Sequence, residues 1–247
     1  MNHLLNIIKF YKLFKNNYLE AITNYLSKSN TIKPIKFIRT NDFNILYFDN
    51  LFITDDCAFC FKNVYNINEV SYIPIEINNT HFFLIPSVNQ IFTNHLFIND
   101  FIHNESIHEN KINNMQKILD LFPSLMTFYY NSNHNHFELG EINCPLFNKD
   151  ATLFKDEIYK VQWYLPTFLI KDNDINVLNI NLNILNNTYK NHKQILILFK
   201  RFDKYYLYVI YQTNNKLNVY ESIGLFTSNK NISLNKEIAN IKIKMDA

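Results

Sequence analysis

The sequence YYLYVIYQTNNKLNVYES, residues 205–222, is the clearest indication of fold class in this chain. Residues 205–211 are aromatic and β-branched, which favours a strand. Asn214 and Asn215 tolerate the left-handed backbone of a tight turn, and residues 216–222 then form a second β-like run. This stretch therefore predicts a β-hairpin in the C-terminal half of the chain.

The rest of the chain adds helices and further strands. Apolar residues at helical spacing predict an N-terminal helix within residues 3–28 and a central helix within 111–122, ended by Pro123. Runs rich in Ile, Phe, Tyr and Val predict strands at 35–38, 44–48, 58–64, 70–77, 81–85 and 125–130, and nearly everything beyond Phe137 is β-like. We expect an α+β fold, with both helices packed on mainly antiparallel sheet and a β-rich C-terminal half. One domain over residues 1–247 is expected, with a subdivision near 123–140 as the alternative.

Glycine is nearly absent from the chain. Gly140 and Gly224 are the only two among 247 residues, whereas we count 41 asparagines. Because Asn, Ile and Lys have AT-rich codons, we interpret this bias as that of an AT-rich virus or intracellular parasite. Two glycines so far apart cannot form the Rossmann, Walker or nucleophile-elbow motifs, which excludes ordinary NAD enzymes, P-loop NTPases and α/β-hydrolases. Each glycine adjoins a β-like run, so at least one should have a positive φ.

Charge and composition indicate the kind of partner. The net charge is +2, the lysines are dispersed, and Arg39 and Arg201 are the only arginines, so we expect no nucleic-acid partner. No apolar run is long enough to cross a membrane, and we expect the basic N-terminal helix to pack on its own domain rather than on a membrane surface. Three cysteines do not make a disulfide framework, which places the protein inside the cell, in the cytoplasm of host or parasite. Aromatic residues make up 16% and favour a protein partner.

One set of residues has the spacing of a metal site. Cys57 and Cys60 form a C-x2-C pair, and His134 and His136 form an H-x-H pair, which together could complete a tetrahedral zinc site. We nevertheless expect no cofactor, and zinc is the alternative. Residues three apart on a strand point to opposite faces, so the two cysteines could equally be small buried hydrophobic residues. Six of the eight histidines fall in one window, namely His81, His95, His103, His108, His134 and His136.

A thiol nucleophile is the second chemical hypothesis. Cys57 followed by His81 has the order of a cysteine nucleophile and its base, which makes these two residues the candidate catalytic pair. Because every other catalytic signature is absent or broken, we expect a non-enzymatic protein-interaction or structural protein. The alternative is a metal- or thiol-dependent hydrolase that uses a His/Cys cluster within residues 57–136.

Overall fold

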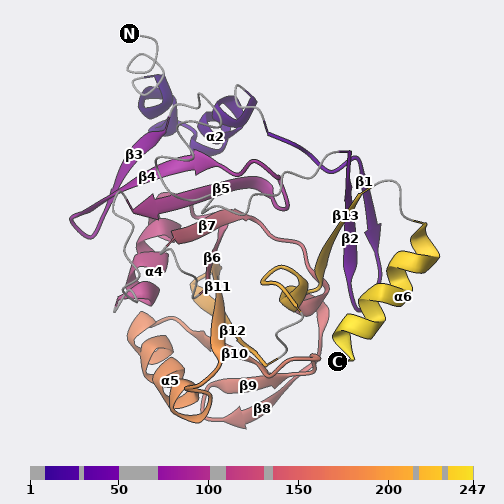
Figure 1. Ribbon diagram of the computed structural model, residues 1–247. Coiled ribbons are helices and arrows are strands. Elements are labelled where there is room, and N and C mark those ends of the chain that lie inside the picture. The colour runs from indigo at the N-terminus through magenta and orange to yellow at the C-terminus, as the bar shows by residue number, and fades with distance from the viewer. Residues whose placement is uncertain are drawn as a thin grey trace.

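The computed structural model describes residues 9–27, 31–49, 72–100, 110–130, 136–213, 217–229 and 233–246. Its main feature is a ten-stranded antiparallel sheet (Figure 1). The strands follow one another across this sheet in the order β3 (Ile73–Ile77), β4 (Thr80–Pro86), β5 (Thr93–Asp100), β7 (His136–Glu141), β6 (Met126–Tyr130), β11 (Lys193–Arg201), β12 (Lys204–Gln212), β10 (Thr167–Asp172), β9 (Ile158–Val161) and β8 (Ala151–Lys155). A smaller sheet has the order β1 (Lys36–Arg39), β2 (Asn44–Phe48) and β13 (Leu225–Asn229).

Both faces of the large sheet are covered. The helices α4 (Lys111–Leu121) and α5 (Ile175–Thr188) pack on one face, where Met115 and Leu182 meet Leu196 of β11. The small sheet and the helix α6 (Leu234–Met245) lie on the other side of the molecule (Figure 1), where Ile45 and Ile241 share a core with Ile197. Alternate residues of β11 therefore belong to two different cores, as the pleat of a strand requires. The predicted α+β fold with a β-rich C-terminal half is confirmed.

The large sheet is built from two topologically equivalent halves. Each half runs strand, strand, strand, helix, strand, strand: β3-β4-β5-α4-β6-β7, then β8-β9-β10-α5-β11-β12. In both halves the fifth strand lies between the third and the fourth. The two fourth strands, β6 and β11, pair antiparallel at the centre and join the halves. The sequence shows no internal repeat, so the repetition lies in the topology.

The N-terminal helix differs from its prediction. Residues 9–14 are helical, and α2 (Tyr18–Ser27) starts again after a break. The side-chain oxygen of Asn17 accepts a hydrogen bond from the backbone N–H of Glu20 at 3.2 Å, which is how a helix start is capped. The single predicted helix is therefore two helical segments within the described residues. No helix in the described ranges is long and apolar enough to cross a membrane.

The predicted C-terminal hairpin has a different partner strand. β12 pairs with β11 in front of it, through a tight turn at Phe202 and Asp203, and Phe202 has a φ of 54°. The chain after β12 forms the 3-10 turn η2 (Glu221–Ile223) instead of a second strand. Gly224 ends that turn with a φ of 84°, which confirms the prediction of a positive φ. The β-like C-terminal half also contains α5 and α6, which the sequence patterns did not predict.

Candidate functional site

Two histidines and a glutamate form a buried ionic cluster on the large sheet. His136 and Glu138 are two residues apart on β7, so their side chains point to the same face. The neighbouring strand β5 places His95 beside them. All three side chains have no solvent exposure. Charged groups are rarely buried to this extent unless they are paired, so this cluster is the first candidate for a functional site.

Two polar contacts hold the ring of His95. Its Nδ1 lies 3.2 Å from the backbone carbonyl oxygen of Asn89. Its Nε2 lies 2.9 Å from Oε2 of Glu138. The imidazole is therefore held between a backbone carbonyl and the carboxylate of Glu138, which orients it in the cluster.

Glu138 is the centre of the cluster. Burial alone would raise the pKa of its carboxyl group, but the hydrogen bonds and charges of His136 and His95 outweigh burial and lower the pKa to about 2. Nε2 of His136 lies 3.5 Å from Oε1 of Glu138. The hydroxyl of Tyr220 donates to both carboxylate oxygens at 3.0 and 3.1 Å. Burial and the nearby carboxylate raise the pKa of Tyr220 well above its ordinary value, which keeps this hydroxyl a donor.

Aromatic rings enclose the cluster. The ring centroids of Phe92 and His95 lie 4.4 Å apart, and those of Tyr130 and His136 lie 4.8 Å apart. Such surroundings have a low local dielectric constant, which strengthens the interactions among the charged groups. Because the three ionic side chains are fully buried, a substrate can reach them only if covering side chains move.

The two histidines and the glutamate lie in the first half of the sheet, and the described strands of the second half carry no equivalent residues on this face. The pairing register places Glu138, Phe128, Ile197 and Tyr208 in one row across β7, β6, β11 and β12, on the same face. β12 is the topological equivalent of β7, but its residues on this face are Tyr206, Tyr208 and Ile210. The cluster is thus a specialisation of one half and not a requirement of the fold.

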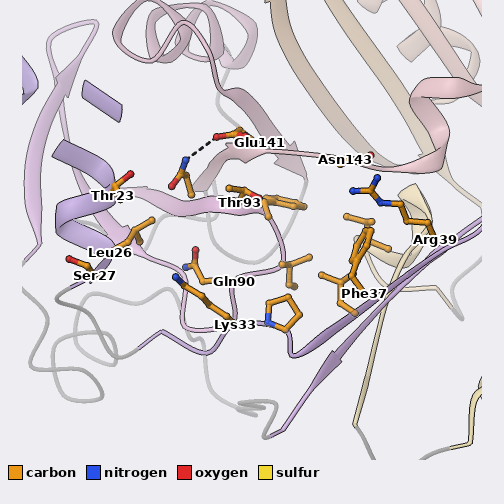
Figure 2. Close-up of a pocket in the computed structure, with 16 residues that line it drawn as sticks. Thr23, Leu26, Ser27, Lys33, Phe37, Arg39, Gln90, Thr93, Glu141 and Asn143 are labelled. Carbon is orange, nitrogen blue, oxygen red and sulfur yellow. Dashed lines mark hydrogen bonds between the residues drawn. The ribbon is translucent and has the colours of Figure 1, made fainter. Parts of the chain in front are cut away.

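A second feature is a pocket of about 560 Å³ that is lined in part by Phe92. Figure 2 shows its lining, which comes from α2, the chain around Lys33, β1, and the start of β5 with the end of β7. Its polar lining residues are Thr23, Ser27, Lys33, Arg39, Gln90, Thr93, Asn94, Glu141 and Asn143.

The predicted site residues are only partly within the described chain. Cys57, Cys60 and His134 lie outside the described residues, so the zinc site and the Cys57 nucleophile stay predictions. His81 is exposed on β4, opposite Glu76 of β3, and does not belong to the buried cluster. Among the described residues, no group of three or more His, Cys, Asp or Glu is arranged to hold a metal ion.

The cluster contains residues that the sequence did not single out. His136 was predicted as a zinc ligand, whereas Glu138 and Tyr220 were not proposed for any role. The one usable signal was the alternation in His136-Phe137-Glu138, which puts a histidine and a carboxylate on one face of a strand. Tyr220 comes from a distant turn and left no signal of its own.

Comparison with known proteins gives a likeness in structure only. No family model matches the chain, and no curated protein matches it in sequence. The crystal structure of yeast Ap4A phosphorylase Apa2 matches with a TM-score of 0.59 at 10% identity, over 100% of this chain and 92% of that chain. Its complex with Ap4A gives a TM-score of 0.59 at 11% identity, over 96% of this chain and 94% of that chain. The chain has the fold of Ap4A phosphorylase.

This likeness corrects the functional interpretation of the sequence. The prediction of a non-enzymatic structural or protein-interaction protein of an AT-rich virus or parasite was wrong, because the whole chain shares its fold with a nucleotide-handling enzyme. The expectation of a protein partner was wrong as well, because solved structures of the yeast enzyme are complexes with the small molecules AMP and Ap4A. Codon bias identified neither a source nor an activity.

Proposed function

We propose that this protein is a nucleotide-binding enzyme that cleaves a phosphoanhydride bond, with inorganic phosphate as the acceptor. The observation that carries the proposal is the buried His95–Glu138–His136 cluster in a fold shared over its full length with Ap4A phosphorylase. Cleavage by phosphate forms a new P–O bond to the acceptor and breaks the bridging P–O bond, so negative charge develops on the leaving nucleotide. The site must therefore tolerate and stabilise phosphate charge.

His136 is the residue that we propose to act on the phosphate chain. Its imidazole is held beside the carboxylate of Glu138, and a group that orients an imidazole in this way is typical of catalytic histidines. Glu138 and Tyr220 then act as positioning residues, because they contact His136 or its partner rather than the substrate.

The contact between His95 and Glu138 affects how the site tolerates an anion. A lone carboxylate beside a polyphosphate would repel it, and the repulsion would be strong in a site without water. Nε2 of His95 lies 2.9 Å from Oε2 of Glu138, and a hydrogen bond from this nitrogen would stabilise the carboxylate charge. The cluster can then hold His136 in place without excluding an anionic substrate.

The experiment is incubation of the purified protein with Ap4A and inorganic phosphate, followed by separation of nucleotides by anion-exchange chromatography. We expect ADP and ATP in equal amounts, because Ap4A and one phosphate together supply the five phosphates of these products. The variant His136→Asn should lose about 10²- to 10⁴-fold in rate, the usual contribution of a catalytic acid, base or nucleophile.

Tyr206→Phe in β12 is the matched control, since it removes one hydroxyl from the half of the sheet that lacks the cluster. Its rate should equal that of the wild type. A folded wild-type protein that releases no nucleotide from Ap4A would overturn the proposed function, and so would equal rates for the wild type and His136→Asn.

A further inference from the structure

The pocket beside α2 combines a stacking surface with free positive charge. Phe37 of β1 is 39% exposed and its ring lies 5.0 Å from the guanidinium of Arg39. Lys33 also lines the pocket. Within the described chain, neither Lys33 nor Arg39 takes part in an ion pair. An exposed aromatic ring next to two uncompensated cations favours a ligand with a planar ring and a phosphate group.

The remaining lining supplies orientation and space. The carboxylate of Glu141 accepts a hydrogen bond from the amide of Asn94 at 2.9 Å, and the two cations outnumber this single carboxylate in the lining. Hydroxyl and amide groups of Thr23, Thr93 and Asn143 surround the space. A volume of about 560 Å³ is within the range of small-molecule sites and accommodates a mononucleotide.

The pocket is distinct from the buried cluster. Figure 2 shows Lys33 and Gln90 between the α2 residues on one side and Phe37 with Arg39 on the other. Gln90 is buried and rigid, because its amide bonds the backbone of Ser87 and both the N–H and the carbonyl of His95. Phe92 also lines the pocket, and the centroid of its ring lies 4.4 Å from that of His95, so Phe92 separates the pocket from the cluster. His136 and Glu138 do not line the pocket.

We infer that this pocket is a second site, which binds a nucleoside phosphate with the base on Phe37 and the phosphate between Lys33 and Arg39. This inference does not rest on the proposed reaction, because every residue that carries it lies outside the cluster. It rests on an exposed aromatic ring that lies near two cations without ion-pair partners. It predicts that affinity depends on both the base and the phosphate of the ligand.

Isothermal titration of AMP tests the inference, with adenosine and inorganic phosphate as separate probes. The titration uses the His136→Asn protein, in which the proposed reactive residue is removed but the pocket is intact. We expect one AMP to bind at the pocket, and adenosine and phosphate alone to bind at least tenfold more weakly. The double variant Lys33→Gln/Arg39→Gln in the same background should bind AMP at least tenfold more weakly. Phe37→Leu should bind AMP roughly tenfold more weakly, because the base can no longer stack on an aromatic ring.

Both cations are exposed, so the double variant should melt at the temperature of its parent, and circular dichroism checks this. AMP binding that is unchanged in Lys33→Gln/Arg39→Gln, or adenosine binding as tight as AMP binding, would overturn the site. The absence of AMP binding in His136→Asn would overturn it as well. Failure of Ap4A cleavage in the wild type, with AMP still bound at the pocket, would reject the proposed reaction and leave this site standing.

Discussion

At the scale of single residues, the ionised carboxylate of Glu138 is the central charge of the site. Its pKa of about 2, against an ordinary value near 4.5, means that the folded state favours the carboxylate. A depressed carboxyl pKa contributes stability that is fully present above the unfolded pKa and is lost as the pH falls through the folded one. Stability of the wild type should therefore decline between about pH 4.5 and pH 2.

The variant Glu138→Gln removes this contribution and leaves the buried rings of His95 and His136 without the carboxylate that contacts them. We expect the free energy of unfolding at pH 7 to fall by about 3–5 kcal/mol, as for other broken buried ion pairs. We also expect the stability of the variant to depend less on pH in the acid range than that of the wild type. Urea unfolding from pH 7 to pH 2.5 measures both. Glu157→Gln, at an exposed position, is the control and should change stability by less than about 0.5 kcal/mol. A Glu138→Gln protein as stable as the wild type would show that the pair is not formed.

Gly224 is a position where the backbone conformation itself requires glycine. Its φ is 84°, and a Cβ there would lie 3.1 Å from Cη2 of Trp163 and 3.2 Å from the carbonyl oxygen of Asp42. Gly224→Ala should cost about 1–2 kcal/mol, the penalty for a left-handed L-residue. Gly224→Asn should cost less in backbone strain, because asparagine visits this region more readily. Thermal unfolding of both variants checks the order, and an alanine variant that is more stable than the asparagine variant would contradict it.

At the scale of elements, α5 shows what a residue pattern can hide. Its sequence INVLNINLNILNNT has buried Leu178, Leu182 and Leu185 at helical spacing, but the intervening Ile and Asn residues disfavour a helix and mask the period. Packing against the sheet overrides this weak propensity. The segment of residues 111–122 was predicted correctly because Ile112, Met115 and Ile118 repeat without such competition.

The start of α5 gives a direct test of its capping. The carboxylate of Asp174 accepts a hydrogen bond from the backbone N–H of Asn176 at 2.8 Å. Asp174→Ala should destabilise the protein by about 1 kcal/mol, whereas Asp174→Asn keeps an acceptor and should cost clearly less. Chemical denaturation of the two variants provides the measurement. Equal losses would mean that the cap contributes nothing through its hydrogen bond.

Strand pairing is the element-scale feature that the sequence could not supply. β12 was predicted as a strand, but its partner was placed after it, because an Asn-Asn pair is a better turn signal than Phe202-Asp203. The actual partner β11 matches it over nine residue pairs, from Lys193 with Gln212 to Arg201 with Lys204. Registers of this kind depend on which faces become buried, and a single sequence does not state that.

At the scale of the whole molecule, the repeated topology joins the two halves through β6 and β11. A subdivision near residues 123–140 was the alternative, but the described strands there, β6 and β7, are both central strands of this one sheet. We therefore propose a single domain and expect one cooperative thermal transition. Near- and far-ultraviolet circular dichroism should give coincident curves, and two separate transitions would favour two domains.

The proposed function also depends on the fold of the whole molecule. Glycine scarcity argues against glycine-rich phosphate loops, but it does not argue against the proposed function, a nucleotide enzyme whose site is built from strands. The candidate site brings together His95, Glu138 and Tyr220 from three separate parts of the chain, so no local motif could reveal it. At 10% identity to the yeast enzyme, the shared fold is visible only in the structure.

The measurement that tests the central claim most directly follows isotopically labelled inorganic phosphate in the presence of unlabelled Ap4A. Phosphorolysis must place the label in a nucleotide product, whereas hydrolysis leaves it as free phosphate. We predict labelled nucleotide with the wild type and with Tyr206→Phe, and a loss of about 10²- to 10⁴-fold with His136→Asn. Unlabelled products, or equal labelling by the wild type and His136→Asn, would contradict the account.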